Sequence, residues 1–196
     1  MPEQASLPGF DPAPKPTDSL FFAILPDAHA ASRIALLAEQ LRSEHGLTGR
    51  TIEIDRFHVT LHHLGTYGGL PPDLLAMAGE VGVSVANAMP PFELAFDRAE
   101  SFSTAPRNRP LVLRGGDGLA ALTAFQQALG TAAKKTRLGR WVKPGYTPHL
   151  TLLYDDRSVA PQAVDTITWT AQELVLVHSL LGPSRHTHLA RWPLRG

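Results

Sequence analysis

Two short stretches of the sequence place a histidine two residues before a threonine, each inside a run of apolar residues. The first is FHVTLHHLG, residues 57–65, and the second is PHLTLLYDD, residues 148–156. Imidazole has an unperturbed pKa of about 6.5, so it can donate or accept a proton near neutral pH. A threonine hydroxyl can donate a hydrogen bond to an oxygen that gains charge. Two such pairs suit in-line displacement at phosphorus, which needs a base on one side and an acid on the other.

The apolar alternation around each histidine is typical of a β-strand, in which successive side chains point to opposite faces. His58 and Thr60 therefore share one face of the first strand. His149 and Thr151 share one face of the second. If two lobes face each other across a cleft, the two imidazoles lie on opposite sides of the same volume. This spacing leaves open which histidine is the acid and which is the base.

The order of elements repeats along the chain and predicts a tandem duplication. From residue 20 to residue 58 and from residue 111 to residue 149 the interval is 38 residues, which aligns the two histidines within equal halves. Periodicity and turn residues set the elements. The expected strands are 20–25, 57–65, 91–102, 110–115, 148–155, 172–182 and 186–194, and the expected helices are 27–46, 71–89 and 117–139.

The expected fold class is α+β, because mostly alternating strands are interleaved with amphipathic helices. We expect a bilobal duplication in which two antiparallel or mixed sheets face each other across a central cleft, with helices on the outer faces. One domain would span 19–196, with lobes at 19–105 and 106–196 and the C-terminal strands able to cross between them. Residues 1–18 are rich in proline and predict a flexible leader, not a signal peptide.

Composition excludes several classes of protein. The chain has 196 residues with 43% apolar content, enough for a buried core, and no apolar run of membrane-spanning length. Its 18 basic and 18 acidic residues cancel, so a nucleic-acid partner should be short or gripped locally. It has no cysteine, which excludes disulfides and thiolate nucleophiles and fits a cytoplasmic location. We expect a monomer.

The two motifs, in HVTLHHLG and YTPHLTLLYD, together with LFFAILP near the start and LARWPL at the end, resemble the two-histidine phosphoesterase superfamily. Within it they are most similar to the RNA 2′,3′-cyclic phosphodiesterases, also called 2′-5′ RNA ligases. The resemblance covers nearly everything after the leader. It implies opening of a terminal 2′,3′-cyclic phosphate on RNA to leave a 2′-phosphate, without a metal or another cofactor. Some members also join or split 2′-5′ linkages in tRNA halves.

The resemblance also implies a role for each motif residue. His58 would give a proton to the departing 3′ oxygen, and His149 would accept a proton from the attacking water. Thr60 and Thr151 would hold the phosphoryl oxygens. Many bacterial members carry an arginine soon after the second motif, where this chain has Tyr154. The phosphate contact would then be lost or made by Arg157.

Further substrate contacts are expected around the motifs, with RNA ends, tRNA fragments or cyclic nucleotides as partners. The basic segment 134–143 precedes the second motif and could contact a phosphate backbone, although cations at the end of a helix also complement its dipole. An aromatic ring beside a motif could stack on a base. His62 continues the face of the first motif, and His63 is expected on the opposite face. The candidate substrate-binding residues are Lys143, Tyr146, Tyr154, Phe57, His62 and Arg107.

Three other functions remain open at this point. A non-catalytic module that binds nucleotides or RNA ends would keep the fold and the cleft, although binding alone gives no reason for two titrating pairs. A two-histidine phosphodiesterase could act on another cyclic or 2′-5′-linked nucleotide. A histidine-bound metal hydrolase is disfavoured, because HVTLHH places its histidines on alternate faces and no paired carboxylate lies near either motif. No metal site is therefore expected.

Overall fold

The computed structural model describes residues 16–103, 107–182 and 185–196. The expected leader lies outside the described residues up to residue 15. The described residues form strands β1 (Asp18–Ile24), β2 (Val59–Tyr67), β3 (Phe92–Ser101), β4 (Arg109–Arg114), β5 (Leu150–Asp155), β6 (Gln162–Ala171), β7 (Glu173–Leu180) and β8 (Arg185–Pro193). The helices are α1 (Ala28–Glu44), α2 (Pro72–Ala86) and α3 (Ala120–Lys134), with 3-10 turns η1 (Ile54–Arg56), η2 (Asp117–Leu119) and η3 (Arg137–Trp141).

The eight strands form one sheet in the order β6-β3-β4-β5-β2-β1-β7-β8. All its paired neighbours are antiparallel, and β2 and β5 are joined through the pair Val59 and Leu150. The expected α+β class is confirmed, whereas the expectation of two separate sheets is wrong. The physical reason is that β2 and β5 hydrogen-bond to each other where they would otherwise present unpaired edges.

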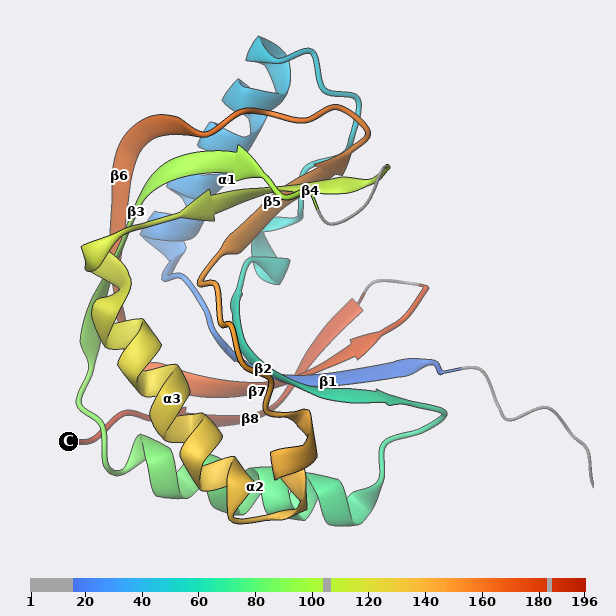
Figure 1. Cartoon of the computed structure of the whole chain (residues 1–196), viewed down its shortest axis with the longest axis vertical. Coiled ribbons are helices and arrows are strands. Elements are labelled where there is room, and N and C mark those ends of the chain that lie inside the picture. The colour runs from blue at the N-terminus through green and yellow to red at the C-terminus, as the bar shows by residue number, and fades with distance from the viewer. Residues whose placement is uncertain (1–15, 104–106, 183–184) are drawn as a thin grey trace, which may run out of the picture.

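The sheet has two halves that do not follow the order of the sequence. β2, β1, β7 and β8 form one half, and β6, β3, β4 and β5 form the other. Each half therefore combines strands from before and after residue 105, so the expected lobe boundary does not separate them. The C-terminal strands do lie beside β1. Figure 1 shows the two halves as a lower and an upper layer that diverge from the join of β2 and β5.

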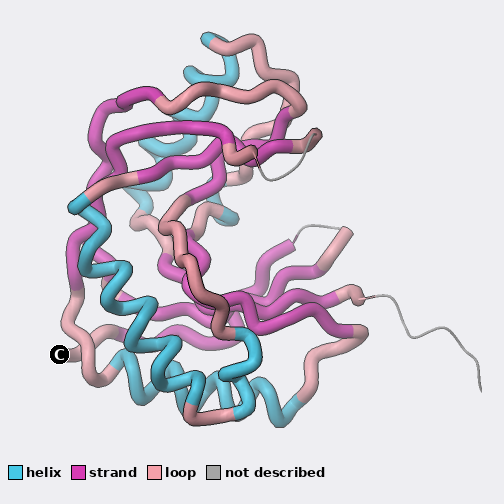
Figure 2. Tube along the Cα trace, in the orientation of Figure 1, coloured by secondary structure: helices cyan, strands magenta, loops and turns pink. Residues whose placement is uncertain are grey.

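The helices cover the outer sides of these halves and close one end. Helix α1 packs on β5 and β6, and α2 packs on β7 and β8. Helix α3 contacts α2, β2 and β3, and thereby connects the two halves (Figure 2). None of the helices in the described ranges is long and apolar enough to cross a membrane.

Strand β1 is buried on both faces, which explains its nearly continuous apolar run. Leu20, Phe22 and Ile24 belong to the main core, together with α1, α2 and α3. Phe21 and Ala23 face the other way and pack with Val175 and Val177 of β7 in a smaller apolar cluster. A central strand between two apolar layers has no polar face to display. The smaller cluster supports the face on which the first motif lies.

A β-bulge in β2 changes which histidine accompanies Thr60. Thr60 pairs with Ala23, but His62 and His63 pair with Phe22 and Phe21, so Leu61 has no partner in the register. The extra residue reverses the alternation beyond it. His63 therefore shares the face of Thr60, and His62 points to the main core. The expectation that His62 would continue this face, with His63 opposite, is wrong.

Candidate active site

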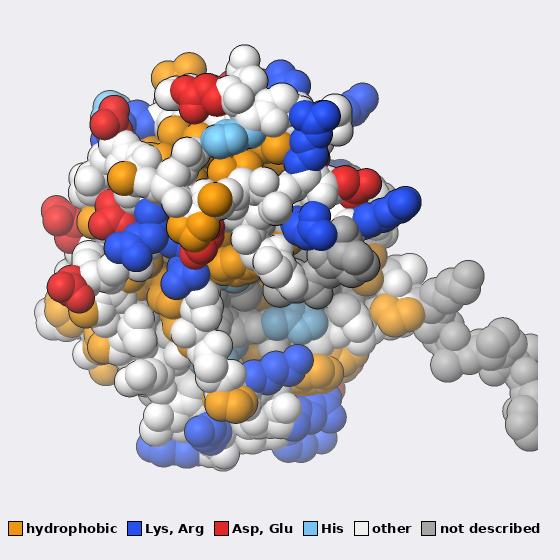
Figure 3. Space-filling view, turned by 45° about the horizontal axis from the view of Figure 1, so that its top comes forward, with side chains coloured by type: hydrophobic (Ala, Val, Ile, Leu, Met, Phe, Trp, Pro, Cys, Tyr) orange, Lys and Arg blue, Asp and Glu red, His pale blue; other side chains and the backbone are white. Residues whose placement is uncertain are grey.

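The two motif histidines lie at the join between the halves of the sheet. His58 immediately precedes β2, His149 immediately precedes β5, and the residues that follow them, Val59 and Leu150, are the pair that joins these strands. Because the join fixes the backbone next to both rings, the positions of the two imidazoles depend on each other. Figure 3 shows histidine side chains in the middle of one face of the molecule, with basic side chains nearby.

Both imidazoles are held by the same local contact. The Nδ1 atom of His58 lies 2.8 Å from the carbonyl oxygen of Arg56. The Nδ1 atom of His149 lies 2.8 Å from the carbonyl oxygen of Thr147. A carbonyl oxygen can only accept, so Nδ1 carries a proton in both rings and Nε2 is left to meet a substrate. Each motif therefore presents the same ring nitrogen.

The electrostatic surroundings favour the neutral form of both rings in the free protein. Burial lowers the pKa of His58, and the nearby charges of His149 and Arg56 lower it further, against the hydrogen bond to the Arg56 carbonyl. Burial also lowers the pKa of His149, with a further contribution from Arg114. The interaction between the two imidazoles places them in one electrostatic site. A bound phosphate anion would raise both pKa values towards the range in which one ring is protonated.

The threonines lie beside the histidines on the paired strands. Thr60 pairs with Ala23, and Thr151 pairs with Val112 of β4. Of the motif residues, Thr60 and His149 line a pocket of about 330 Å³, which we call the central pocket. Its other lining residues are Leu61, His62, His63, Gln126, Trp141, Lys143, Pro144, Gly145, Tyr146 and Thr147.

The face around His58 contains a second imidazole that the sequence interpretation left without a role. The ring centroids of His58 and His186 are 5.2 Å apart and nearly perpendicular. Phe21 contacts both, at 4.9 Å from His58 and 5.6 Å from His186. His186 and His188 occupy alternate positions of β8, opposite Ser179 and Val177. The sequence HTH, residues 186–188, lies in a predicted strand and places both histidines on one face. This pattern could have indicated that the strand contributes imidazoles to a site.

The face around His149 contains an arginine that the sequence interpretation also missed. Phe102 meets His149 edge-to-face with centroids 5.0 Å apart, and the guanidinium of Arg114 lies 5.6 Å from the Phe102 ring centroid. Arg114 also forms an ion pair of 2.7 Å with Glu100. The fixed guanidinium thus places positive charge near His149. From the sequence, Arg114 can be predicted only to share a face of its strand with Val112, two residues earlier. Its contact with Phe102 could not be predicted, because that contact depends on the pairing of β3 with β4.

The predicted substrate-binding residues fall into different environments. Lys143 and Tyr146 line the central pocket. Phe57 is 2% exposed within the main core, so the expectation that it could stack on a base is wrong. Tyr154 is exposed and pairs with Pro110, on the same side of the sheet as Thr151 and Val112 because a bulge precedes it.

The remaining candidates are less closely tied to the motifs. Arg107 is exposed in the segment before β4. Arg157, the alternative phosphate ligand, donates from Nη1 to the carbonyl oxygen of Gly46 at 2.8 Å. His62 is 5% exposed, and its Nε2 donates to the carbonyl oxygen of Gln126 at 3.0 Å. His62 therefore attaches β2 to α3, and it also lines the central pocket.

The α+β fold has a single sheet, and both histidine motifs lie where β2 pairs with β5. These two features define a protein of the two-histidine phosphoesterase class. A sequence model described as the 2′-5′ RNA ligase superfamily matches residues 19–183. The chain belongs to this superfamily, whose activity is of the phosphoesterase or ligase type, and the resemblance stated from its motifs is confirmed. A search of curated proteins found no match.

Solved structures with the same fold cover nearly the whole chain. TT0787 of Thermus thermophilus is 22% identical, covers 91% of this chain and 98% of its own, and superposes with a TM-score of 0.73. LigT of E. coli in its apo form is 24% identical, covers 93% of this chain and 100% of its own, and has a TM-score of 0.68. These proteins establish the fold that positions the motifs.

The histidines of this face should make the stability of the protein depend on pH. Burial first, and then the charge of His58, lower the pKa of His186 from 6.5 to about 4. A group with a lowered pKa contributes stability above the pKa of the unfolded chain and loses it as the pH falls towards its folded value. For a partly exposed ring we expect a loss on the order of 1 kcal/mol between pH 7 and pH 5.

The variant His186→Phe keeps an aromatic ring against Phe21 and His58 but cannot take up a proton. Urea unfolding at pH 7 and pH 5 should therefore show a smaller loss of stability in the variant than in the wild type. His29→Gln, on the exposed surface of α1, is the control and should retain the wild-type difference. Equal losses in His186→Phe and the wild type would show that His186 does not contribute.

Proposed function

We propose that this protein hydrolyses the terminal 2′,3′-cyclic phosphate of RNA to a 2′-phosphate, with His58 as acid and His149 as base. The observation that carries the proposal is that both Nδ1 atoms are held by backbone carbonyls at 2.8 Å, which leaves both Nε2 atoms for the reacting groups. A module that only binds nucleotides would not need two imidazoles that both leave Nε2 available for proton transfer. Phe21 and Phe102 contact the His58 and His149 rings, respectively, which supports their fixed positions.

In the proposed reaction, a water oxygen attacks phosphorus and its proton passes to Nε2 of His149. The bond between phosphorus and the 3′ oxygen breaks, and that oxygen receives the proton from Nε2 of His58. The product is a 2′-phosphomonoester with a free 3′ hydroxyl. Afterwards His58 is neutral and His149 is protonated, so proton exchange with solvent restores the starting state. The hydroxyl groups of Thr60 and Thr151 donate to the non-bridging oxygens as charge accumulates on them.

The proposed substrates are RNA ends, such as those of tRNA fragments, and cyclic nucleotides. The protein would act in the cytoplasm as a monomer. LigT of E. coli has been solved in complex with 3′-AMP, with NADP+ and with ATP, which supports a nucleotide as the ligand of this fold. Lys143 and Tyr146 would contact the nucleotide in the central pocket. Tyr154 and Arg107 would contact more distant parts of the RNA. Formation of a 2′-5′ linkage would use the two histidines in the same roles, with the 5′ hydroxyl of a second RNA attacking phosphorus in place of water and the 3′ oxygen leaving.

Product analysis tests this proposal. Protein treated with a chelator is incubated with adenosine 2′,3′-cyclic phosphate, and the product is identified by phosphorus NMR. We expect adenosine 2′-phosphate. Adenosine 3′-phosphate would contradict the bond that we propose to break. Turnover of a 3′,5′-cyclic or a 2′-5′-linked nucleotide in place of this substrate would favour another phosphodiesterase activity, and binding without turnover would favour a non-catalytic module.

A further inference from the structure

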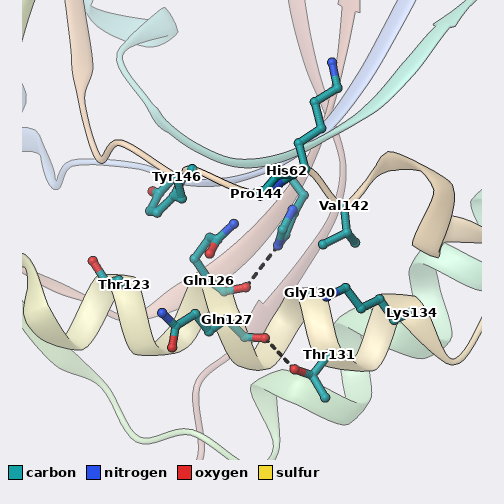
Figure 4. A pocket seen from close by; sticks show the side chains of 12 residues that line it. His62, Thr123, Gln126, Gln127, Gly130, Thr131, Lys134, Val142, Pro144 and Tyr146 are labelled. Atoms are coloured by element: carbon teal, nitrogen blue, oxygen red, sulfur yellow. Dashed lines mark hydrogen bonds between the residues drawn. The ribbon is translucent and has the colours of Figure 1, made fainter.

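A second pocket, of about 310 Å³, lies between helix α3 and the segment that leads into β5. We call it the α3 pocket. Figure 4 shows its two sides, with Gln126, Gln127 and Lys134 on the helix and Pro144 and Tyr146 on the facing segment. Its lining residues are His62, Thr123, Gln126, Gln127, Gly130, Thr131, Lys134, Val142, Lys143, Pro144, Gly145 and Tyr146.

The charge of the α3 pocket is entirely positive. Lys134 and Lys143 both line it, and none of the described residues that line it is acidic. Within the described ranges, neither lysine forms an ion pair. Their field reaches the neighbouring strand: after burial, the charge of Lys134 lowers the pKa of His62, and that of Lys143 lowers the pKa of His63. Two lysines without a counter-charge in a concave site favour an anion.

The uncharged polar groups of the α3 pocket differ in what they can offer a ligand. The hydroxyl of Thr131 already donates to the carbonyl oxygen of Gln127 at 2.9 Å, and that of Thr123 donates to the carbonyl oxygen of Leu119 at 3.0 Å. Both hydroxyl protons are therefore engaged with the helix, whereas the exposed side-chain amide of Gln127 can donate to a ligand beside the two ammonium groups. Donors of this kind match the oxygens of a phosphodiester.

The α3 pocket adjoins the central pocket. Lys143, Tyr146 and Gln126 line both, as do His62, Pro144 and Gly145. The central pocket in turn includes Thr60 and His149. A chain that leaves the reacting phosphate along this wall therefore passes Lys143 and then Lys134. Because the two pockets share a wall, an RNA whose end lies at the two histidines can also reach the α3 pocket.

We propose that the α3 pocket is a second anion site, which binds the phosphodiester on the 5′ side of the terminal nucleotide. The inference rests on the proposed function and extends it: the preferred substrate is an oligonucleotide with a cyclic phosphate, and a mononucleotide lacks one of the two anions that the surface accommodates. Of the two lysines, Lys134 belongs to this site alone, since it lines the α3 pocket and not the central pocket.

The test compares kcat/KM for a dinucleotide ending in a 2′,3′-cyclic phosphate with kcat/KM for adenosine 2′,3′-cyclic phosphate. In Lys134→Gln the ratio of the two should fall about fivefold from the wild-type ratio, which corresponds to about 1 kcal/mol. Lys134→Arg should restore it. Lys135→Gln is the matched control, because this adjacent lysine is also exposed but lines neither pocket. A wild-type ratio in Lys134→Gln would overturn the proposal.

A binding measurement separates this inference from the proposed function. The dinucleotide ApA carries the internal phosphodiester but no reacting phosphate, so calorimetry reports the α3 pocket whether or not the protein is an enzyme. We expect Lys134→Gln to weaken ApA binding about fivefold and to reduce the salt dependence of the affinity by about one ion. Unchanged binding in Lys134→Gln would overturn the anion site. Weakened binding without turnover of either cyclic substrate by the wild type would support the site and contradict the proposed activity.

Discussion

Replacement of either His58 or His149 by alanine is expected to lower kcat for a 2′,3′-cyclic nucleotide by about 10³-fold. Each ring carries one proton transfer of the reaction, and a positioned acid or base contributes about 10²–10⁴-fold to a rate. The two losses should be similar, because the two rings are held by equivalent bonds of 2.8 Å to a carbonyl two residues upstream. Initial rates at saturating substrate measure the effect.

The loss in both variants should come from chemistry and not from unfolding. Near-ultraviolet circular dichroism of each variant should match that of the wild type. His29→Ala, which removes an exposed imidazole of α1, is the control and should retain the wild-type rate. If either His58→Ala or His149→Ala keeps more than about a tenth of the wild-type kcat, the corresponding ring is not the acid or the base of the reaction.

The variant Asp155→Ala is expected to lower the free energy of unfolding by about 3 kcal/mol. Asp155 is 6% exposed at the end of β5. Its Oδ2 accepts from the amides of Thr48 and Gly49 at 2.6 and 2.7 Å, and its Oδ1 accepts from the amide of Arg157 at 2.8 Å. Removal of the carboxylate leaves these donors without a partner, at about 1–3 kcal/mol for each buried group. The segment that follows α1 would then be held to β5 mainly by the backbone pairing of Thr51 with Leu153.

Urea unfolding at pH 7 measures this effect, and Asp156→Ala is its matched control. Asp156 is exposed and accepts from the amide of Asn108 at 2.8 Å, so its loss should cost less than about 1 kcal/mol. The hydrogen bond from the Arg157 amide is the main cause that lowers the pKa of Asp155. Its contribution is therefore present at neutral pH and should be lost only as the pH falls below about 4. Equal destabilisation by the two variants would contradict this role of Asp155.

The motif residues could be predicted because their signals are local. A histidine and a threonine two positions apart share a face in any strand, so His58 with Thr60 and His149 with Thr151 needed no knowledge of the fold. The face of His62 could not be obtained in this way, since the bulge in β2 depends on pairing with β1. The burial of Phe57 likewise depends on packing that its place beside a motif does not indicate.

Strand order and the second set of site residues are non-local properties. Strand β6 was not expected, because its sequence QAVDTITWTA is rich in polar residues and it lies at the edge of the sheet. β8 reaches the site only because β7 pairs with β1, which brings His186 against His58. Arg114 approaches His149 through the pairing of β4 with β5 and β3. No spacing within the chain encodes the contact of His186 with His58 or the approach of Arg114 to His149.

The pH dependence of kcat/KM for adenosine 2′,3′-cyclic phosphate tests whether the two imidazoles act as an acid and base pair. The reaction needs one protonated and one neutral ring, so the rate should rise to the lower pKa and fall above the higher one. Both pKa values in the free protein lie below 6.5, because burial disfavours the charged form of His58 and of His149. We therefore predict a bell-shaped profile with its maximum below pH 6.5. A rate that keeps rising through pH 7.5, or a profile with no limb on the alkaline side, would contradict the pair.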